Sequence, residues 1–499
     1  MTRLRAWKVI AVFVLCGPTN NAQTFTVLAS FDGANGFEPG YGTLAQGANG
    51  AFYGTTIYGG ANCPKYLEGN CGTAFMVTPA GVLTTLYNFC SLPFCMDGFA
   101  PTGGLALGTD EYFYGTTHFG GNGYCNHRIG CGTVFKVPPR GGPITNLVRF
   151  NTGVGGYPGD TLVQGTDGSW YGTTEAGAST ACDGGCGTVF KITPDGALTT
   201  LHRFDGTDGS TPPAALVQAT DGNFYGVTSG GGAHGNGTVF KISPTGAFAI
   251  LYNFCAQPNC VDGREPLSAL IQGEDGDLYG TTVLGGGGPG CGTGGCGTVF
   301  KITPQGTLIS LHQFCLESGC PDGAEPYAGL IRGTDGTFYG TTYDGGPDGI
   351  NGAGTIFAIT PDGTLTTVHD FCNDPYCSDG GLPLSGLVQG TGGKFYGTTQ
   401  IGGLYGGEGF GTAYSLDVGL GPFVAFVRSY GKVGQTGGIL GQGFTGTTSV
   451  SLNGIPASFS VKSDTYLTAT VPPGATTGYV TVMTPSGTLT SNVPFRVLQ

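Results

Sequence analysis

Charge is scarce in this chain of 499 residues, and positive charge is the scarcest kind. Asp, Glu, Lys and Arg make up 10% of the residues, and 19 Lys and Arg stand against 32 Asp and Glu, so the formal net charge is -13 at pH 7. A protein that neutralises nucleic-acid phosphates normally carries an excess of positive charge. The composition therefore argues against nucleic acid as a partner.

Long apolar runs are lacking as well. After residue 22 no segment reaches about 18 uninterrupted apolar residues, the length that a membrane-spanning helix needs, so we expect no transmembrane segment. A shorter apolar stretch, residues 9–15, follows three basic residues and leads to Ala22, which is typical of a secretory signal peptide over residues 1–22. We expect export to the periplasm, the cell surface or the medium, with lipidation of Cys16 as an alternative to removal with the signal.

Glycine and proline are abundant instead, with 99 Gly and 30 Pro. An aperiodic chain of this kind would be expected to be disordered, so only a regular period argues for a fold. The phrase Phe-Tyr-Gly-Thr-Thr, or a close variant, occurs seven times, and each copy precedes a second phrase such as Gly-Thr-Val-Phe-Lys-Ile-Thr-Pro and, except in the last unit, a third such as Leu-Thr-Thr-Leu-His-Arg-Phe. The seven motif tyrosines are Tyr53, Tyr114, Tyr171, Tyr225, Tyr279, Tyr339 and Tyr396.

Each repeat predicts four short strands, which are rich in β-branched and aromatic residues and separated by Asp-Gly turns. Four strands in each of seven units predict an all-β fold, a seven-bladed β-propeller over residues 23–418. The seventh unit lacks its fourth strand, whereas Phe25 to Phe31 supplies one with no unit before it. We therefore expect this N-terminal strand to close the last blade. A solenoid, the alternative, would need no such exchange.

Sixteen cysteines besides Cys16 form eight neighbouring pairs. Four pairs follow the third phrase directly: Cys90 with Cys95, Cys255 with Cys260, Cys315 with Cys320, and Cys372 with Cys377. The other four end just before the second phrase: Cys63 with Cys71, Cys125 with Cys131, Cys182 with Cys186, and Cys291 with Cys296. All-or-none pairing in an exported chain predicts local disulfides. Zinc is disfavoured because no Cys or His half-site recurs in register, so we predict no metal site.

The predicted loops fall on two unequal faces. The turns between the first and second strands and between the third and fourth share one face. The loops between the second and third strands and those between blades, which carry the cysteine pairs, share the other face. Variable loops on a rigid scaffold favour ligand recognition there. Five aspartates there form a candidate ligand-binding rim: Asp97, Asp208, Asp262, Asp322 and Asp379. The alternative is that each aspartate hydrogen-bonds its own loop. We expect no cofactor, with Ca²⁺ at this rim as the one alternative.

Catalytic groups are hard to find. Three histidines recur at one position of the third phrase, where a repeated strand position explains them, and His118, His127 and His234 occur singly in loops. None recurs beside a Ser or Cys nucleophile, so we predict no catalytic residue.

Residues 421–499 carry short alternating strands and no cysteine, which predicts a small β-sandwich. The phrases Ile-Leu-Gly-Gln-Gly-Phe and Val-Ser-Leu-Asn-Gly in this segment resemble an IPT/TIG domain, which implies an Ig-like fold. The repeats themselves, with Asp-Gly-x-Phe-Tyr-Gly-Thr-Thr and Lys-Ile-Thr-Pro-Asp-Gly, resemble the GloVer tandem repeat over residues 25–418. That family comprises exported bacterial proteins with a choice of surface anchor, and the resemblance implies no catalytic residue.

Two functions from different classes follow. The first is a monomeric, exported binding or structural module that recognises a glycan, polymer or protein through its disulfide-bearing face. The second is an enzyme, because the units distantly resemble streptogramin-lyase propellers; such a lyase, or a hydrolase, would need a metal-assisted site on that face. A histidine close to two carboxylates at the mouth of the channel would favour the enzyme.

Overall fold

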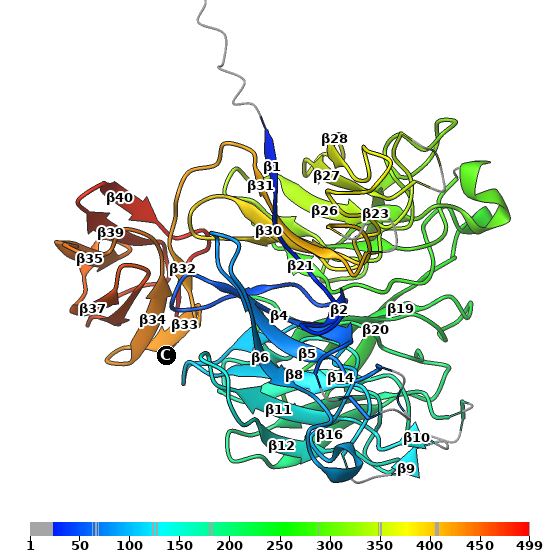
Figure 1. Cartoon of the computed structure of the whole chain (residues 1–499), viewed down its shortest axis with the longest axis horizontal. Coiled ribbons are helices and arrows are strands. Elements are labelled where there is room, and N and C mark those ends of the chain that lie inside the picture. The colour runs from blue at the N-terminus through cyan, green and yellow to red at the C-terminus, as the bar shows by residue number, and fades with distance from the viewer. Residues whose placement is uncertain are drawn as a thin grey trace, which may run out of the picture.

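The computed structural model describes residues 23–498 apart from 62, 65, 66, 68, 122, 123, 126, 127, 179, 180, 183, 288, 348, 350, 351 and 405–408. The expected signal segment 1–22 with Cys16, and His127, lie outside the described residues. No helix in the described part is long and apolar enough to cross a membrane. The fold is all-β, as predicted (Figure 1).

Seven antiparallel sheets follow one another along the repeats, and we number them sheets 1 to 7. Sheets 1 to 3 comprise β3 (Ala45–Gln46), β4 (Phe52–Tyr58), β5 (Thr73–Val77) and β6 (Leu83–Asn88); β7 (Ala106–Leu107), β8 (Phe113–Thr117), β11 (Thr133–Val137) and β12 (Thr145–Arg149); and β13 (Val163–Gln164), β14 (Trp170–Thr174), β15 (Thr188–Ile192) and β16 (Leu198–Arg203). A short strand, β2 (Phe37–Pro39), also pairs with β4, and β9 (Tyr124–Cys125) with β10 (Arg128–Ile129) forms a separate hairpin.

Sheets 4 to 7 repeat the same order. They comprise β17 (Val217–Gln218), β18 (Phe224–Thr228), β19 (Thr238–Ile242) and β20 (Phe248–Asn253); β21 (Ile271–Gln272), β22 (Leu278–Thr282), β23 (Thr298–Ile302) and β24 (Leu308–Gln313); β25 (Ile331–Arg332), β26 (Phe338–Thr342), β27 (Thr355–Ile359) and β28 (Leu365–Asp370); and β29 (Val388–Gln389), β30 (Phe395–Thr399), β31 (Thr412–Asp417) and β1 (Thr24–Ser30). Among the described loop residues, three 3₁₀ turns are present: Pro93–Cys95, Pro258–Cys260 and Pro289–Gly294.

The N-terminal strand completes the last sheet, as its isolated third phrase predicts. Thr24 lies opposite Asp417 and Ser30 opposite Thr412, so β1 pairs with β31 over its whole length. Figure 1 shows β1 alongside β31 although the two strands come from opposite ends of the repeats. Sheet 7 therefore has the same four repeat strands as the other sheets, and its outer strand is present.

Neighbouring sheets pack through the motif tyrosines, and sheet 7 packs on sheet 1 in the same way. Six sheet-to-sheet contacts are aromatic pairs with ring centroids 3.8–4.3 Å apart, all stacked except the tilted fifth: Tyr53 on Phe113, Tyr114 on Trp170, Tyr171 on Phe224, Tyr279 on Phe338, Tyr339 on Phe395, and Tyr396 on Phe52. Between sheets 4 and 5, Tyr225 packs in one core cluster with Leu278. These rings form core between sheets rather than an exposed surface.

The rest of the motif is explained by contacts within each sheet. Gly172 has no room for a side chain, because a Cβ there would lie 2.6 Å from the ring of Phe190. The last threonine of the motif bonds the first threonine of the next strand, as Thr228 does with Thr238, and the seven such pairs have oxygens 2.8–3.0 Å apart in the buried core. Buried hydroxyls need such partners, so the threonine pair fixes the same strand register in every sheet although the loop between the two phrases varies in length.

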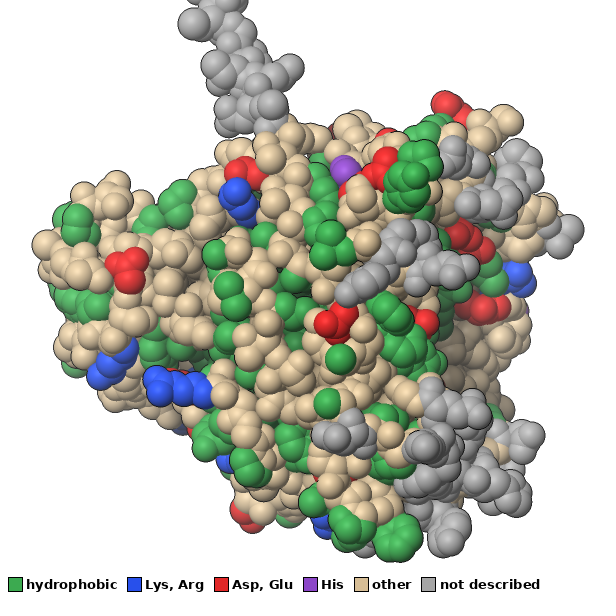
Figure 2. All heavy atoms as spheres, viewed as in Figure 1, with side chains coloured by type: hydrophobic (Ala, Val, Ile, Leu, Met, Phe, Trp, Pro, Cys, Tyr) green, Lys and Arg blue, Asp and Glu red, His purple; other side chains and the backbone are tan. Residues whose placement is uncertain are grey.

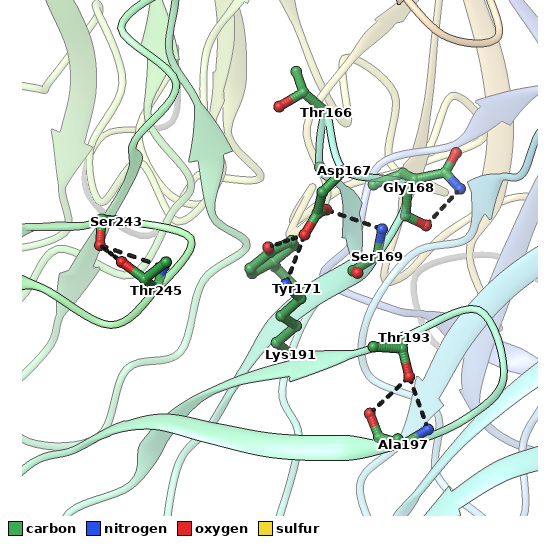
Figure 3. A network of polar contacts seen from close by, with 12 residues as sticks. Thr166, Asp167, Gly168, Ser169, Tyr171, Lys191, Thr193, Ala197, Ser243 and Thr245 are labelled. Carbon is green, nitrogen blue, oxygen red and sulfur yellow. Dashed lines mark hydrogen bonds and ion pairs between the residues drawn. The ribbon is translucent and has the colours of Figure 1, made fainter.

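The Asp-Gly turns are fixed by a second polar network (Figure 3). In sheet 3, Asp167 accepts hydrogen bonds from the hydroxyl of Tyr171 at 2.8 Å and from the backbone N–H of Ser169 at 3.0 Å, and it pairs with Lys191 at 2.7 Å. Sheets 2, 4 and 5 have the same Asp, Tyr and Lys arrangement. These charged residues of the repeat therefore hold the turns. Figure 2 shows few charged side chains on the face in view.

All eight predicted cysteine pairs form disulfides, with Cα atoms 4.0–5.7 Å apart. They stiffen the loops between the second and third strands and those that lead to the next sheet. Because every bond joins residues of one loop, the disulfides fix loop conformation and not the contacts between sheets.

The C-terminal module, residues 425–498, has two four-stranded sheets around one core. One sheet contains β32 (Ala425–Phe426), β34 (Thr436–Leu440), β38 (Tyr466–Thr470) and β37 (Phe459–Ser463), and the other contains β36 (Ile455–Pro456), β35 (Ser449–Leu452), β39 (Val480–Thr484) and β40 (Gly487–Thr490). β33 (Tyr430–Lys432) pairs in parallel with β41 (Arg496–Leu498). Phe444, Leu467 and Val482 lie fully buried in the shared core.

The C-terminal module lies on the turns between the first and second strands of the repeat sheets. Its side chains reach the turns of sheets 1, 3, 4, 5 and 7: Thr465 to Ala48, Tyr430 to Gly165, Arg496 to Ala219, Tyr479 to Glu274, and Gln442 to Thr391. The turn face is thus covered near the point where the sheets converge. The disulfide-bearing loops lie at the opposite end of the strands.

Candidate functional site

A cavity of about 1060 Å³ lies where the seven sheets converge. Residues of all seven sheets and of the segments that lead into them line it, and its walls include short residues such as Ala215 and Gly329. Leu67 and Asn70, from the loop closed by Cys63 and Cys71, also line it, so the cavity extends to the disulfide-bearing loops. The C-terminal module covers the opposite, turn face. The cavity is therefore the concave site that the fold offers to a ligand.

One series of positions near the cavity comes directly after the constant motif. In the seven repeats the residue that follows Phe-Tyr-Gly-Thr-Thr, or its variant, differs every time: Ile57, His118, Glu175, Ser229, Val283, Tyr343 and Gln400. Four of these, from sheets 1 to 4, line the cavity. A position that varies within a constant scaffold is suited to contact with a ligand. We call these seven the motif-end positions.

A second series precedes the proline that leads into each first strand: Glu38, Ala100, Tyr157, Thr211, Glu265, Glu325 and Leu382. All seven have φ between 49° and 59°, a conformation that residues other than glycine rarely adopt. Their backbone carbonyls accept hydrogen bonds from the motif-end positions. The carbonyl of Tyr157 accepts from the N–H of Glu175 at 3.0 Å, and five other pre-proline carbonyls accept in the same way from the next motif-end residue. Such strain is maintained by surrounding structure and concentrates at functional sites. We call these seven the pre-proline positions.

Two carboxyl groups face the cavity from sheet 3. Asp160 accepts hydrogen bonds from the hydroxyl of Thr161 at 3.0 Å and from the backbone N–H of Ala215 at 2.9 Å, which ties sheet 3 to sheet 4. No described residue donates a hydrogen bond to the carboxyl group of Glu175. Gly159 makes room for it, since a Cβ at that position would lie 2.4 Å from Glu175 Oε1.

Burial sets the charge of this pair. Burial raises the pKa of Asp160, although hydrogen bonds from Thr161 and Ala215 oppose the change. Burial and the charge of Asp160 raise the pKa of Glu175 to about 7. A carboxyl group with a pKa near neutrality in a cleft is a typical mark of a functional site.

A second acidic pair lies in sheet 6. Burial raises the pKa of Glu325, and burial together with the charge of Glu325 raises the pKa of Asp344 to about 6. This second pair is not part of the cavity lining, whose acidic groups are Asp160 and Glu175. No Lys or Arg is found among the described residues that line the cavity.

Aromatic side chains surround the acids. Tyr327 lines the cavity and meets Tyr343 edge to face at 5.2 Å, and His118 stacks on Tyr157 at 5.1 Å. Burial, Tyr58 and the carboxylates of Glu38 and Glu175 raise the pKa of Tyr41, which also lines the cavity. The site combines apolar ring faces with hydroxyl and carboxyl groups, an arrangement suited to ligands with both apolar and hydroxylated surfaces.

The five aspartates of the predicted rim lie in loops outside the cavity lining. Asp97 and Asp262 are 0% and 1% exposed, and each accepts hydrogen bonds from a strand tyrosine and from two backbone N–H groups of its loop. Asp208, Asp322 and Asp379 contact a strand histidine at 2.7–3.2 Å and a backbone N–H group. All five therefore hold their own loops, and a ligand or Ca²⁺ at this rim stays a prediction.

His118 is the histidine that the cavity brings together with carboxyl groups, because Asp160 and Glu175 line the same space. In the sequence His118 stands out as a single loop histidine, whereas neither acid stands out. A signal for Glu175 is present, since the residue after a motif repeated seven times changes in every copy. No such signal marks Asp160, whose position, counted from the proline, is filled by Tyr41 in the first repeat and by Gly, Ala or Ser in the others.

Comparisons with known proteins agree with the repeat. A family model for the Gloeobacter/Verrucomicrobia repeat matches residues 15–212, 67–293 and 289–443. No curated protein matches the sequence. Among solved structures, a fungal alcohol oxidase of the AA5 family in complex with copper is similar at 13% identity, covering 91% of this chain and 96% of its own, with a TM-score of 0.49. A putative gluconolactonase covers 70% of this chain and 93% of its own at 12% identity, with a TM-score of 0.38.

Proposed function

The chain belongs to the Gloeobacter/Verrucomicrobia repeat family, and on that premise we propose that it is an exported binding module that recognises a glycan in its central cavity. In this proposal the seven sheets are the blades of a closed β-propeller over residues 23–418. Residues 421–499 are an Ig-like domain of the IPT/TIG type that covers the turn face. The ligand enters from the disulfide-bearing face.

The contacts between sheets support a closed ring of seven blades. Tyr396 stacks on Phe52, and the backbone N–H of Thr391 donates to the side chain of Gln46 at 3.0 Å, so the last sheet packs on the first. The pairing of β1 with β31 gives the last blade its outer strand. A closed ring leaves no unpartnered end sheet, which a solenoid would have to cap.

Eight disulfides support export, because such bonds form and persist in oxidising compartments. The periplasm, the cell surface and the medium all meet this condition.

The observation that carries the binding proposal is the cavity with its two series of positions. A rigid, repeated scaffold holds a different side chain at each motif-end position, and the strained pre-proline backbone fixes that side chain in place. Tyrosine rings would stack on the apolar faces of sugar rings, and the carboxyl and hydroxyl groups would bind sugar hydroxyls. A glycan uses both kinds of surface.

The test uses the oxidised full-length protein on a glycan array, followed by calorimetric titration of the strongest ligand. Tyr327→Ala is expected to weaken binding about tenfold or more, the usual effect of removing an aromatic anchor. Tyr376→Ala is the matched control, because Tyr376 is 72% exposed in a disulfide loop and outside the cavity. Equal effects of the two variants would place the binding site elsewhere, and absence of any glycan ligand would refute the proposal. Titrations with Ca²⁺ and with EDTA test the aspartate rim in the same samples.

The second candidate function is a lyase or hydrolase, with a metal-assisted site on the same face. It is favoured by one observation, that His118, Asp160 and Glu175 line one cavity. Histidine and carboxyl groups are the usual acids and bases of such reactions. Release of new reducing ends or unsaturated products from a bound polysaccharide, abolished in His118→Gln, would support the enzyme. Binding without turnover, with and without added metal ions, would leave the binding module.

A further inference from the structure

The acidic cavity narrows the class of ligand. Its described lining contains the carboxyl groups of Asp160 and Glu175 but neither Lys nor Arg. Glu38 and Glu325, at pre-proline positions, lie near enough to the lining residues Tyr41 and Tyr327 to raise the pKa of these tyrosines. A cleft with carboxylates of one sign attracts cations and repels anions, so a uronic acid or a sulfated sugar is a poor occupant.

The two acids of sheet 3 differ in whether their carboxyl groups already have hydrogen-bond donors. Asp160 accepts hydrogen bonds from Thr161 and Ala215. Glu175 is partly buried in the wall of the cavity, and no described residue donates a hydrogen bond to its carboxyl oxygens. A carboxylate without a protein donor can accept a hydrogen bond from a bound ligand. A positively charged donor would make the stronger bond.

Aromatic rings lie near Glu175, where a cation bound to its carboxyl group would contact them. Tyr41 is close enough to Glu175 for the two groups to interact electrostatically, and His118 and Tyr157 stack beside the backbone that carries Glu175. The faces of such rings attract an ammonium group.

From the unpartnered Glu175 carboxyl group in this cationless, tyrosine-rich cavity, we propose that the glycan bound here carries a free, protonated amine, which donates to Glu175. The ligand is then an amino sugar that is not N-acetylated. This inference rests on the proposed function, since it names the class of glycan that the same cavity takes.

The experiment compares short glucosamine oligomers with N-acetylglucosamine oligomers of the same length and linkage, by calorimetry on the oxidised full-length protein at neutral pH. The glucosamine oligomer is expected to bind about tenfold or more tightly, as a charge-assisted hydrogen bond would provide. Glu175→Gln is expected to remove that preference and to leave the weaker binding of the acetylated oligomer unchanged. Glu175→Asp, which keeps the charge, is expected to retain part of the preference. Glu317→Gln, at an exposed loop residue, is the control.

The outcomes separate the two proposals. Equal binding of both oligomers, insensitive to Glu175→Gln, would overturn the amine and leave the glycan-binding function standing. Binding of neither oligomer, together with an empty glycan array, would refute both. Binding of an oligolysine peptide without either sugar would show that the amine belongs to a protein partner, and would overturn the amino sugar.

Discussion

Replacing Glu175 by Gln is expected to stabilise the protein at alkaline pH and not at acid pH. Burial and the charge of Asp160 raise the pKa of Glu175 from its ordinary 4.5 to about 7 in the folded state. The folded protein therefore holds this proton more tightly than the unfolded chain, and stability that is complete below about pH 4 is lost as the pH rises through 7. At about 1.4 kcal/mol per pKa unit, the ionised side chain destabilises the fold at pH 8 by about 3 kcal/mol. Glutamine keeps the shape of the side chain and removes this cost.

The two groups near Glu175 also have raised pKa values. Burial raises the pKa of Asp160, and hydrogen bonds from Thr161 and Ala215 oppose that change. The pKa of Tyr41 is raised above its ordinary 10.0, so Tyr41 keeps its proton throughout this range.

The assay is denaturant unfolding of the oxidised wild type and variant at several pH values, because the midpoint at constant slope reports stability. Glu317→Gln serves as the exposed control, for which no pH-dependent difference is expected. A difference between wild type and Glu175→Gln that is constant from about pH 4 to pH 8, or a variant that is less stable at pH 8, would refute the assignment of Glu175 as a buried, unpaired acid.

Three further predictions concern the scaffold. Thr228→Val leaves the buried hydroxyl of Thr238 without its partner and is expected to cost about 1–3 kcal/mol by denaturant unfolding, whereas Val at the exposed Thr245 should change little. Deletion of β1 exposes the edge of β31 and is expected to enlarge the particle in X-ray scattering and to open sheet 7 to protease; unchanged scattering would contradict its role in closure. Double substitution of Cys255 and Cys260 by Ser is expected to cost about 2–3 kcal/mol and to speed amide exchange in that loop while the strands of sheet 5 stay protected.

The sequence was sufficient for the features that recur. The same residue types have the same structural role in every repeat, such as a buried tyrosine between sheets and a threonine pair between strands. The period alone therefore predicts seven four-stranded units. The absent third phrase of the last unit predicts the pairing of β1, and the spacing of cysteines predicts the eight disulfides. The first strands have only two residues each, because only the Val-Gln step or its equivalent pairs with the motif strand.

The site could not be found in the same way, because it consists of what does not recur. Glu175 and His118 hold equivalent positions in different sheets, and their common cavity exists only once seven sheets converge. The raised pKa of Glu175 depends on burial by other repeats, which no local pattern records. The contact of Tyr430 with Gly165 likewise depends on how the C-terminal module sits on the turns.

The pairing of Thr24 with Asp417 also dictates an order of assembly. β1 is synthesised first, but its partner β31 follows only after almost the entire repeat region. Until the two strands pair, the edge of β31 is open to other chains. Such a distant contact is slow to form. The disulfides impose no such delay, since both cysteines of each bond leave the ribosome within a few residues of one another. Oxidation can therefore finish unit by unit before β1 pairs with β31, and the covalent bonds neither hinder nor guide that pairing.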